Sequence, residues 1–308
     1  MTAAEEYPVT AAFRGLRLDR FLQQMLPRMS RTAIQEALAS RVRLASGALP
    51  KPSRRLAVGD VVTIVPRPPA DVPALAIPAL AEGAGWVVVD KPAGISTTPS
   101  ARRPGEDVAT RLGLAPAHRL DRATSGCLLL TRDPVTARWF DLAFRERRVE
   151  KEYLAVVAGS PPHDTFVIDA PLGVDAGSRV PNKVAVQALG APATTRCEVL
   201  ARHGDRTLLR ARPLTGRRHQ IRVHLAHAGH PIVGDLLYGG DERAFLRFLL
   251  GRGDAAPAGL AAGRHLLHAH RLAFRDPLAA RRVEVEAPWP ADFDFGRHCN
   301  VVLPRTGS

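Results

Sequence analysis

Five prolines fall within residues 66–82, PRPPADVPALAIPALAE, and this segment most limits how the chain can fold. Proline lacks a backbone N–H and has a fixed φ, so such a segment cannot form the interior of a helix or of a central strand. It predicts a linker, or an extended segment along a sheet edge, between two parts of different pattern. A chain of 308 residues is also long enough for about two domains.

Residues 10–66 are expected to form a small α/β unit with a basic surface. Apolar residues recur at helical spacing over 18–26 and 33–38, and two strand-like runs follow. The unit holds ten Lys and Arg against three Asp and Glu, a net charge of +7 out of +13 for the whole chain. This excess favours a phosphate-binding module, and the alternative is a solvated basic face. The candidate RNA contacts are Arg31, Arg41 and Arg43.

Residues 83–305, beyond a linker at 67–82, are expected to form an α+β domain around a mixed or antiparallel sheet. Many strand-like runs alternate with few helical segments, as is typical of this class. The expected helices span about 134–147 and 217–228, and an Ala/Gly-rich insertion with one helix spans 240–263. The expected strands are 86–89, 126–131, 153–158, 196–200 and 207–211.

Residues 117–126, AHRLDRATSG, surround the carboxylate of Asp121 with cationic side chains. Nearby cations keep an Asp ionised and lower its pKa. An ionised, positioned Asp can act as a nucleophile, as an acid or base, or as a metal ligand. The alternative is an ordinary ion pair at the start of the apolar strand that follows.

Residues 206–234 contain six Arg and four His but no Asp or Glu. Thr215 is expected to cap a helix that starts at Arg217 and places Arg218 and Arg222 on one face. Such a helix needs an external anion: a phosphate, a distant carboxylate such as Asp121, or both. The histidines include two HxxH spacings, but no carboxylate or cysteine accompanies them, so we expect no metal site.

Two further positions are candidates for RNA binding. Tyr153 opens an apolar strand, where it is either core filler or an aromatic plate for a base. Lys91 lies in Asp90–Gly94, a rigid basic turn after a strand. Neither a Walker-type nor a dinucleotide-binding glycine motif is present in the sequence.

The remaining features favour a cytoplasmic protein. The three cysteines lie far apart and form no close pair, which fits a reducing compartment. The N-terminal residues lack the basic and apolar regions of a signal peptide, and no apolar run reaches 18 residues. We therefore expect no membrane segment.

Taken together, these blocks resemble the RluA family of RNA pseudouridine synthases over about residues 83–293. The residues that carry the resemblance are Asp90–Gly94, His118–Gly126, Lys151–Tyr153, Leu214–Leu225 and His230–Tyr238. The pair HRLDRxTSG and TGRxHQIRVHL is highly specific. Residues 10–66 look like the αL RNA-binding domain of many members that modify large-subunit ribosomal RNA.

The resemblance implies cofactor-free isomerisation of uridine to pseudouridine, most simply in large-subunit ribosomal RNA. It implies a catalytic set of Asp121, Tyr153 and Arg222. In this set Asp121 is the essential residue, Arg222 forms an ion pair with it, and Tyr153 stacks on the target base and is a candidate for proton transfer. It also implies that Arg119 contacts the RNA at the flipped nucleotide. Arg217, Arg218 and His219 are counted as further RNA contacts, and a monomer is expected.

Three other functions stay open at this point. A tRNA-directed pseudouridine synthase needs the same catalytic residues. A non-catalytic RNA-binding factor for ribosome assembly needs the same charge distribution, although it has little use for an acid that faces phosphates. A metal-dependent hydrolase built on the histidines is the remotest of the three.

Overall fold

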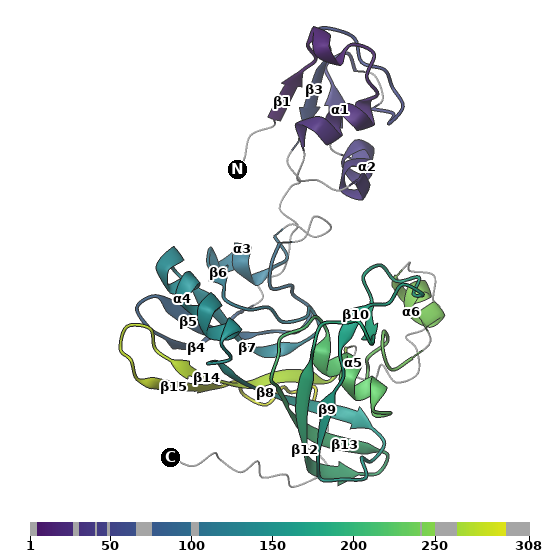
Figure 1. Ribbon diagram of the computed structural model, residues 1–308. Coiled ribbons are helices and arrows are strands. Elements are labelled where there is room, and N and C mark those ends of the chain that lie inside the picture. The colour runs from purple at the N-terminus through teal and green to yellow at the C-terminus, as the bar shows by residue number, and fades with distance from the viewer. Residues whose placement is uncertain are drawn as a thin grey trace. The chain divides into compact units, whose positions relative to one another are not determined.

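The computed structural model describes residues 5–26, 31–40, 42–47, 50–65, 76–99, 105–240, 242–249 and 264–293. The chain divides into two compact units (Figure 1). The first comprises Met1–Ala74 with Pro99–Asp107, and the second comprises Leu75–Thr98 with Val108–Ser308. Within the described ranges, no helix is long and apolar enough to cross a membrane.

The N-terminal unit packs two helices on a three-stranded antiparallel sheet of order β1-β3-β2. Its core is apolar and includes Leu18, Phe21 and Leu22 from the first long helix. Strand β1 begins at Glu5, so the unit extends upstream of the expected start at residue 10, because a short exposed strand carries little apolar signal. The elements are β1 (Glu5–Pro8), η1 (Ala11–Phe13), α1 (Leu18–Met25), α2 (Arg31–Ser40), β2 (Val42–Leu44) and β3 (Val61–Ile64).

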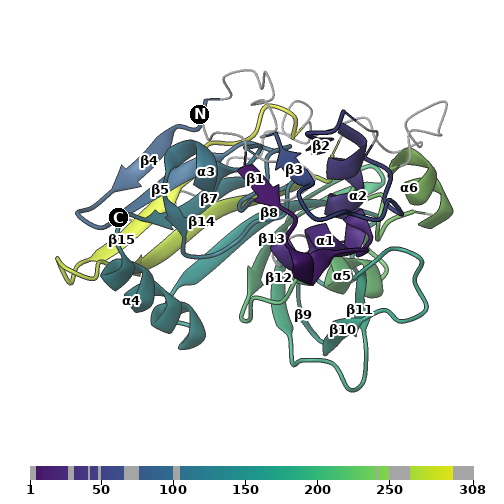
Figure 2. The same cartoon turned by 90° about the horizontal axis from the view of Figure 1, so that it is seen from above.

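The C-terminal unit is built on a ten-stranded mixed sheet, which confirms the expected α+β class. Its path runs β4-β5-β7-β14-β8-β13-β12-β9, with β6 paired to β7 and β15 paired to β14 (Figure 2). The strands are β4 (Ala79–Glu82), β5 (Trp86–Lys91), β6 (Ala115–Pro116), β7 (Ser125–Thr131), β8 (Glu150–Ala158), β9 (Thr165–Asp169), β12 (Thr194–His203), β13 (Arg206–Pro213), β14 (Leu267–Arg275) and β15 (Arg282–Glu286). A separate pair joins β10 (Leu172–Val174) and β11 (Val184–Val186).

The pairing of β7 with β14 joins the two halves of the sheet. It is parallel, whereas the other pairings in this sheet are antiparallel. The chains approach so closely there that a Cβ on Gly126 would lie 2.2 Å from the carbonyl oxygen of Ala269. Gly126 also has a φ of 105°, so only glycine fits this position. The loop that carries Asp121 enters β7 directly before this crossing.

Within the part of this unit that the structure describes, four helices accompany the sheet: α3 (Val108–Leu112), α4 (Pro134–Arg145), α5 (Gln220–His227) and α6 (Glu242–Leu249). Helix α4 starts where the sequence predicts, because the Asp133 carboxylate accepts a hydrogen bond from the Thr136 backbone N–H at 2.8 Å. Helix α6 lies in the predicted insertion, of which residues 250–263 are outside the described residues. Residues 79–82 of the proline-rich segment form β4, an edge strand of the sheet.

Candidate active site

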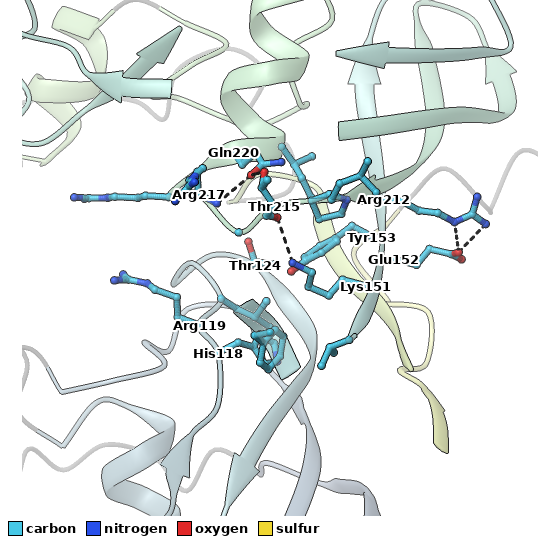
Figure 3. Close-up of a pocket in the computed structure, with 18 of the residues that line it drawn as sticks. His118, Arg119, Thr124, Lys151, Glu152, Tyr153, Arg212, Thr215, Arg217 and Gln220 are labelled. Atoms are coloured by element: carbon cyan, nitrogen blue, oxygen red, sulfur yellow. Dashed lines mark hydrogen bonds and ion pairs between the residues drawn. The ribbon is translucent and has the colours of Figure 1, made fainter. Parts of the chain in front are cut away.

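One pocket of about 800 Å³ in the C-terminal unit brings together several distant segments (Figure 3). They are the loop before β7, the end of α4, the start of β8, the end of β13 and the turn into α5. The pocket is thus formed where strands and helices of both halves of the sheet meet. Of the candidate catalytic and RNA-binding residues, those that line it are Arg119, Asp121, Tyr153, Arg217, Arg218, His219 and Arg222.

The loop that carries Asp121 is held from both sides by the segment that follows β5. The Thr97 hydroxyl donates to the Leu120 carbonyl at 2.9 Å and accepts from the Leu120 backbone N–H at 3.0 Å. Gly94 and Arg122 exchange a second pair of hydrogen bonds, at 2.8 and 2.7 Å. Asp121 lies between these two clamped residues, so its backbone position is set by the fold before any substrate binds.

Lys91, counted above as an RNA contact, is part of this clamp instead. Its side chain is fully buried, and its ammonium donates to the carbonyl oxygens of Pro92, Ile95 and Arg122 at 2.9, 2.9 and 3.3 Å. Burial lowers the pKa of Lys91 to about 7. In this structure the side chain offers no surface to a phosphate, so the prediction of a direct RNA contact is wrong.

We expect Lys91→Met to destabilise the protein without changing how RNA affinity depends on salt. Methionine has no ammonium group, so the buried carbonyl oxygens lose their hydrogen-bond donor, which costs about 1–3 kcal/mol of the free energy of unfolding. For a chain of this size the melting temperature should fall by about 2–4 °C per kcal/mol, measured by calorimetry. Lys51→Met, an exposed control, should change it little. A reduced salt dependence of RNA binding in Lys91→Met would instead indicate that Lys91 does contact RNA.

Arg222 connects Asp121 to a second carboxylate, that of Asp235. Its Nη1 donates to Oδ2 of Asp121 at 2.9 Å, while Nε and Nη2 donate to the two oxygens of Asp235 at 2.6 and 2.9 Å. Asp235 is 1% exposed and also accepts the backbone N–H groups of Leu237 and Tyr238. The Tyr238 ring lies 4.9 Å from the Arg222 guanidinium carbon. Arg222 is therefore fixed in direction, and it can give only one N–H group to Asp121.

This arrangement leaves Asp121 ionised and partly free. Burial alone would raise its pKa, but the positive charge of Arg222, smaller electrostatic contributions from neighbouring groups and the hydrogen bond from Arg222 together outweigh burial and hold the pKa below its usual value. The carboxylate is 19% exposed in the pocket. Its Oδ1 lies 3.7 Å from Nε2 of His219, a distance too long for a hydrogen bond. One oxygen of Asp121 is thus available to a substrate.

The turn into α5 differs from the sequence-based prediction. The helix starts at Gln220, and His219 precedes it with a left-handed φ of 55°. Thr215 does not cap it: the Thr215 hydroxyl donates to the Gln220 side-chain oxygen at 2.6 Å, and that oxygen also accepts the Arg217 backbone N–H. The Gln220 amide therefore closes residues 215–219 into a turn that displays His219 and two arginines on the pocket wall.

His219 is neutral at pH 7, because burial lowers its pKa to about 4. Its Nδ1 shares a hydrogen bond of 2.8 Å with the Tyr238 hydroxyl, and its Nε2 faces Asp121. A neutral imidazole held in this way adds a polar wall to the pocket without adding charge. Its predicted contact with RNA stays a prediction.

Tyr153 and Lys151 line the pocket from β8. Burial, and then the negative charge of Asp121, raise the pKa of Tyr153 above that of a free phenol. The phenol is therefore protonated at neutral pH and can present its ring to an aromatic ligand. Lys151 donates to the Thr215 carbonyl at 3.2 Å (Figure 3), and burial lowers its pKa to about 8.

The other predicted RNA contacts fall into two groups. Arg119, Arg217 and Arg218 are exposed at the pocket, and Figure 3 shows Arg119 and Arg217 extending in the same direction. The rest belong to the N-terminal unit, where Arg43 is exposed on β2 and Arg31 begins α2. The Arg31 side chain and the whole of Arg41 lie outside the described residues.

The histidines of residues 219–230 do not form a metal site. Both ring nitrogens of His224 are hydrogen-bonded, to the Thr195 hydroxyl at 2.9 Å and to the Ala170 carbonyl at 3.0 Å. His230 shares a hydrogen bond with the Ala158 carbonyl instead. Among the residues that the structure describes, no three His, Cys, Asp or Glu side chains gather in a way that could hold a metal ion.

Two functional features escaped the sequence analysis. Asp235 is the first acidic residue after the arginine-rich segment, and this position was the available signal that it pairs with Arg222. Thr97 gave no such signal, because nothing in its local sequence indicates that its hydroxyl holds the Asp121 loop.

The sequence of this chain, including the residues that line the pocket, is similar to those of known proteins. Residues 85–227 match the family model described as RNA pseudouridylate synthase. An uncharacterized RNA pseudouridine synthase of Chloroflexus aurantiacus is 36% identical over 296 residues, covering 91% of this chain and 88% of the relative. Ribosomal large subunit pseudouridine synthase C of Escherichia coli K12 is 34% identical over 303 residues, covering 91% of each chain.

The fold agrees with these sequence similarities. The solved structure of human RNA pseudouridylate synthase domain containing 1 matches with a TM-score of 0.55 at 29% identity, covering 70% of this chain and 84% of that chain. A second human protein, RNA pseudouridylate synthase domain containing 4, matches with a TM-score of 0.54 at 26% identity. The family-model match includes the pocket-lining segments from the Asp121 loop to α5.

Proposed function

The chain belongs to the family of RNA pseudouridine synthases, as the motifs predicted, and we propose that it isomerises specific uridines of large-subunit ribosomal RNA with Asp121 as the catalytic residue. The observation that carries this proposal is the ion pair of Asp121 with Arg222 in a pocket rimmed by exposed arginines. The pocket supplies the ionised carboxylate of Asp121 for chemistry and several cations for an RNA backbone. The bacterial relatives named for the large ribosomal subunit support this choice of RNA.

The reaction conserves all atoms of the uridine. The bond between N1 of uracil and C1′ of ribose breaks, the base turns, and a bond forms between C5 and C1′. C5 then loses its proton, and N1 gains one. Asp121 either attacks the nucleoside covalently or removes a proton on a glycal route. Both routes need an ionised carboxylate, which Arg222 maintains, and neither needs a cofactor.

The target uridine must leave its base stack to reach Asp121, which costs about a few kcal/mol for a paired base. The ring of Tyr153 supports this step, because it lines the same pocket and can stack on the extruded uracil. Arg119, Arg217 and Arg218 support it as well, since they present positive charge to the phosphates on either side of the base.

The deciding experiment is pseudouridine mapping of total RNA from the native host, with and without this gene. Loss of pseudouridine at specific large-subunit rRNA positions in the deletion strain is the expected result. Loss in tRNA alone would favour the tRNA-directed alternative. No loss, together with inactivity of the purified protein on both RNAs, would favour the non-catalytic assembly factor.

The N-terminal unit is proposed to add RNA affinity through its basic surface. We expect Arg43→Gln combined with Lys51→Gln to weaken binding and to flatten its salt dependence, with the slope of log K against log salt falling by about 0.7–0.9 per lost phosphate contact. Both side chains are exposed. Filter binding of a ribosomal RNA fragment at several salt concentrations measures the slope.

Arg206→Gln provides the control for that pair, because Arg206 is exposed at the start of β13, away from the pocket-lining end of this strand. Its slope should match that of the wild type. An unchanged slope in the double variant would mean that these side chains do not contact RNA. The monomeric state and the cytoplasmic location expected from the sequence stay predictions.

A further inference from the structure

The end of helix α4 contains an arginine in a position that favours glycine. The backbone N–H of Arg148 donates to the Ala143 carbonyl at 2.8 Å, and that of Arg147 donates to the Phe144 carbonyl at 3.2 Å. These two hydrogen bonds define a Schellman motif, in which the residue after the C-cap has a left-handed conformation and is usually glycine. Here that residue is Arg147, with a φ of 58°.

The strained position belongs to the rim of the candidate active site. The described part of the chain has four non-glycine residues with positive φ, and two of them, Arg147 and His219, line the Asp121 pocket. Non-glycine residues in this conformation gather at functional sites, where the side chain has a use that offsets the strain. A local reason for arginine at 147 is missing, because the turn itself needs only a flexible backbone.

The arginines next to Arg147 are paired with acidic side chains, whereas the charge of Arg147 is not paired. Arg145 forms an ion pair with Asp141 at 2.8 Å. Arg148 forms one with Glu146 at 2.6 Å and also lies over the Trp139 ring at 5.2 Å. The exposed guanidinium of Arg147 has no hydrogen bond or ion pair with any part of the chain that the structure describes.

Resting on the proposed function, we propose that Arg147 binds a phosphate of the RNA strand whose uridine enters the pocket. Arg119 and Arg218 line the same pocket from the Asp121 loop and from the turn into α5, so Arg147 adds a positive charge from a third segment, the turn after α4. A guanidinium matches a phosphate with two parallel hydrogen bonds and keeps its charge at every physiological pH. The left-handed backbone at 147 fixes the point from which this side chain leaves the helix end.

The test uses two substitutions in the full-length protein that separate backbone strain from charge. Arg147→Gly removes both, so the melting temperature should rise by about 2 °C while RNA affinity falls. The affinity for a short oligouridine should drop several-fold, and the slope of log K against log salt should decrease by about 0.7, as expected for one single-strand phosphate contact. Arg147→Lys keeps the charge and should keep most of that slope.

Arg148→Gln is the matched control, because it removes one positive charge from the adjacent residue whose charge is already paired. Its slope should stay close to that of the wild type. Unchanged affinity and slope in Arg147→Gly would overturn the proposal, as would an equal decrease in both variants, which would indicate a diffuse charge effect. Pseudouridine formation by the wild-type protein is assayed separately, so a failure of the proposed reaction is distinguishable from a failure of this contact.

Discussion

Asp121→Asn is expected to stop pseudouridine formation, with kcat falling by at least about 10³-fold. The asparagine amide has the shape of the carboxylate and can still accept a hydrogen bond from Arg222. It carries no negative charge, however, so it can neither attack the nucleoside nor take up a proton. Release of tritium from RNA labelled at C5 of uracil measures this loss, because C5 exchanges its hydrogen for the new carbon–carbon bond.

The same variant should bind RNA within a few-fold of the wild type, because it removes only a negative charge from a surface that faces phosphates. Asp141→Asn is the matched control: Asp141 also lines the pocket, but its carboxylate is exposed and paired with Arg145. It should retain activity. Near-normal activity of Asp121→Asn, or a loss of activity explained wholly by lost binding, would contradict the catalytic role.

The direction of the Asp121 pKa shift adds an expectation for the pH profile. Because the pKa lies below the usual value of about 3.9, the carboxylate is ionised above that pH and is protonated only in stronger acid. The rate should therefore hold as the pH falls from neutrality to about 5. A loss of rate near neutral pH that is caused by protonation of Asp121 would show that Arg222 does not keep this carboxylate ionised.

Strands β5, β7 and β8 could be predicted because most of their residues are buried on both faces of the sheet. Strand β7 is buried at each of its seven positions, and its residues 127–130 form a continuous apolar run in the sequence. Strands β1 and β4 lie at sheet edges, are short and are largely exposed, so periodicity gives no signal for them. The edge strand β4 agrees with one of the two interpretations of the proline-rich segment, since proline is tolerated beside an edge.

The sequence identifies the charged residues of the site, but it does not predict the direction or the partners of their side chains. Sequence shows that Lys91 is basic and follows a strand, but burial and three carbonyl acceptors decide that it faces inward. The sequence predicts that Arg218 and Arg222 need an anion, whereas the sharing of Arg222 between Asp121 and Asp235 depends on long-range packing. The left-handed conformation of His219 likewise results from the Gln220 side chain closing the turn.

Asp235→Asn is expected to impair both stability and catalysis. It leaves the buried Arg222 guanidinium without its two-point partner, and removing one member of a buried ion pair costs about 3–5 kcal/mol of the free energy of unfolding. Arg222 would then be free to turn toward Asp121 and give it two N–H groups instead of one. That change occupies the second carboxylate oxygen and lowers its basicity, so kcat should fall by about 10²-fold at temperatures where the variant is folded.

Asp292→Asn separates the two effects, because Asp292 makes the same two-point contact with a buried arginine, Arg264, which does not line the Asp121 pocket. Both variants should lose stability in chemical denaturation, since each leaves an arginine short of its carboxylate. Only Asp235→Asn should lose kcat in the tritium-release assay when both are measured well below their melting temperatures. Equal kcat values in the two folded variants would reduce Asp235 to a structural residue and would show that Asp121 does not depend on the direction of Arg222.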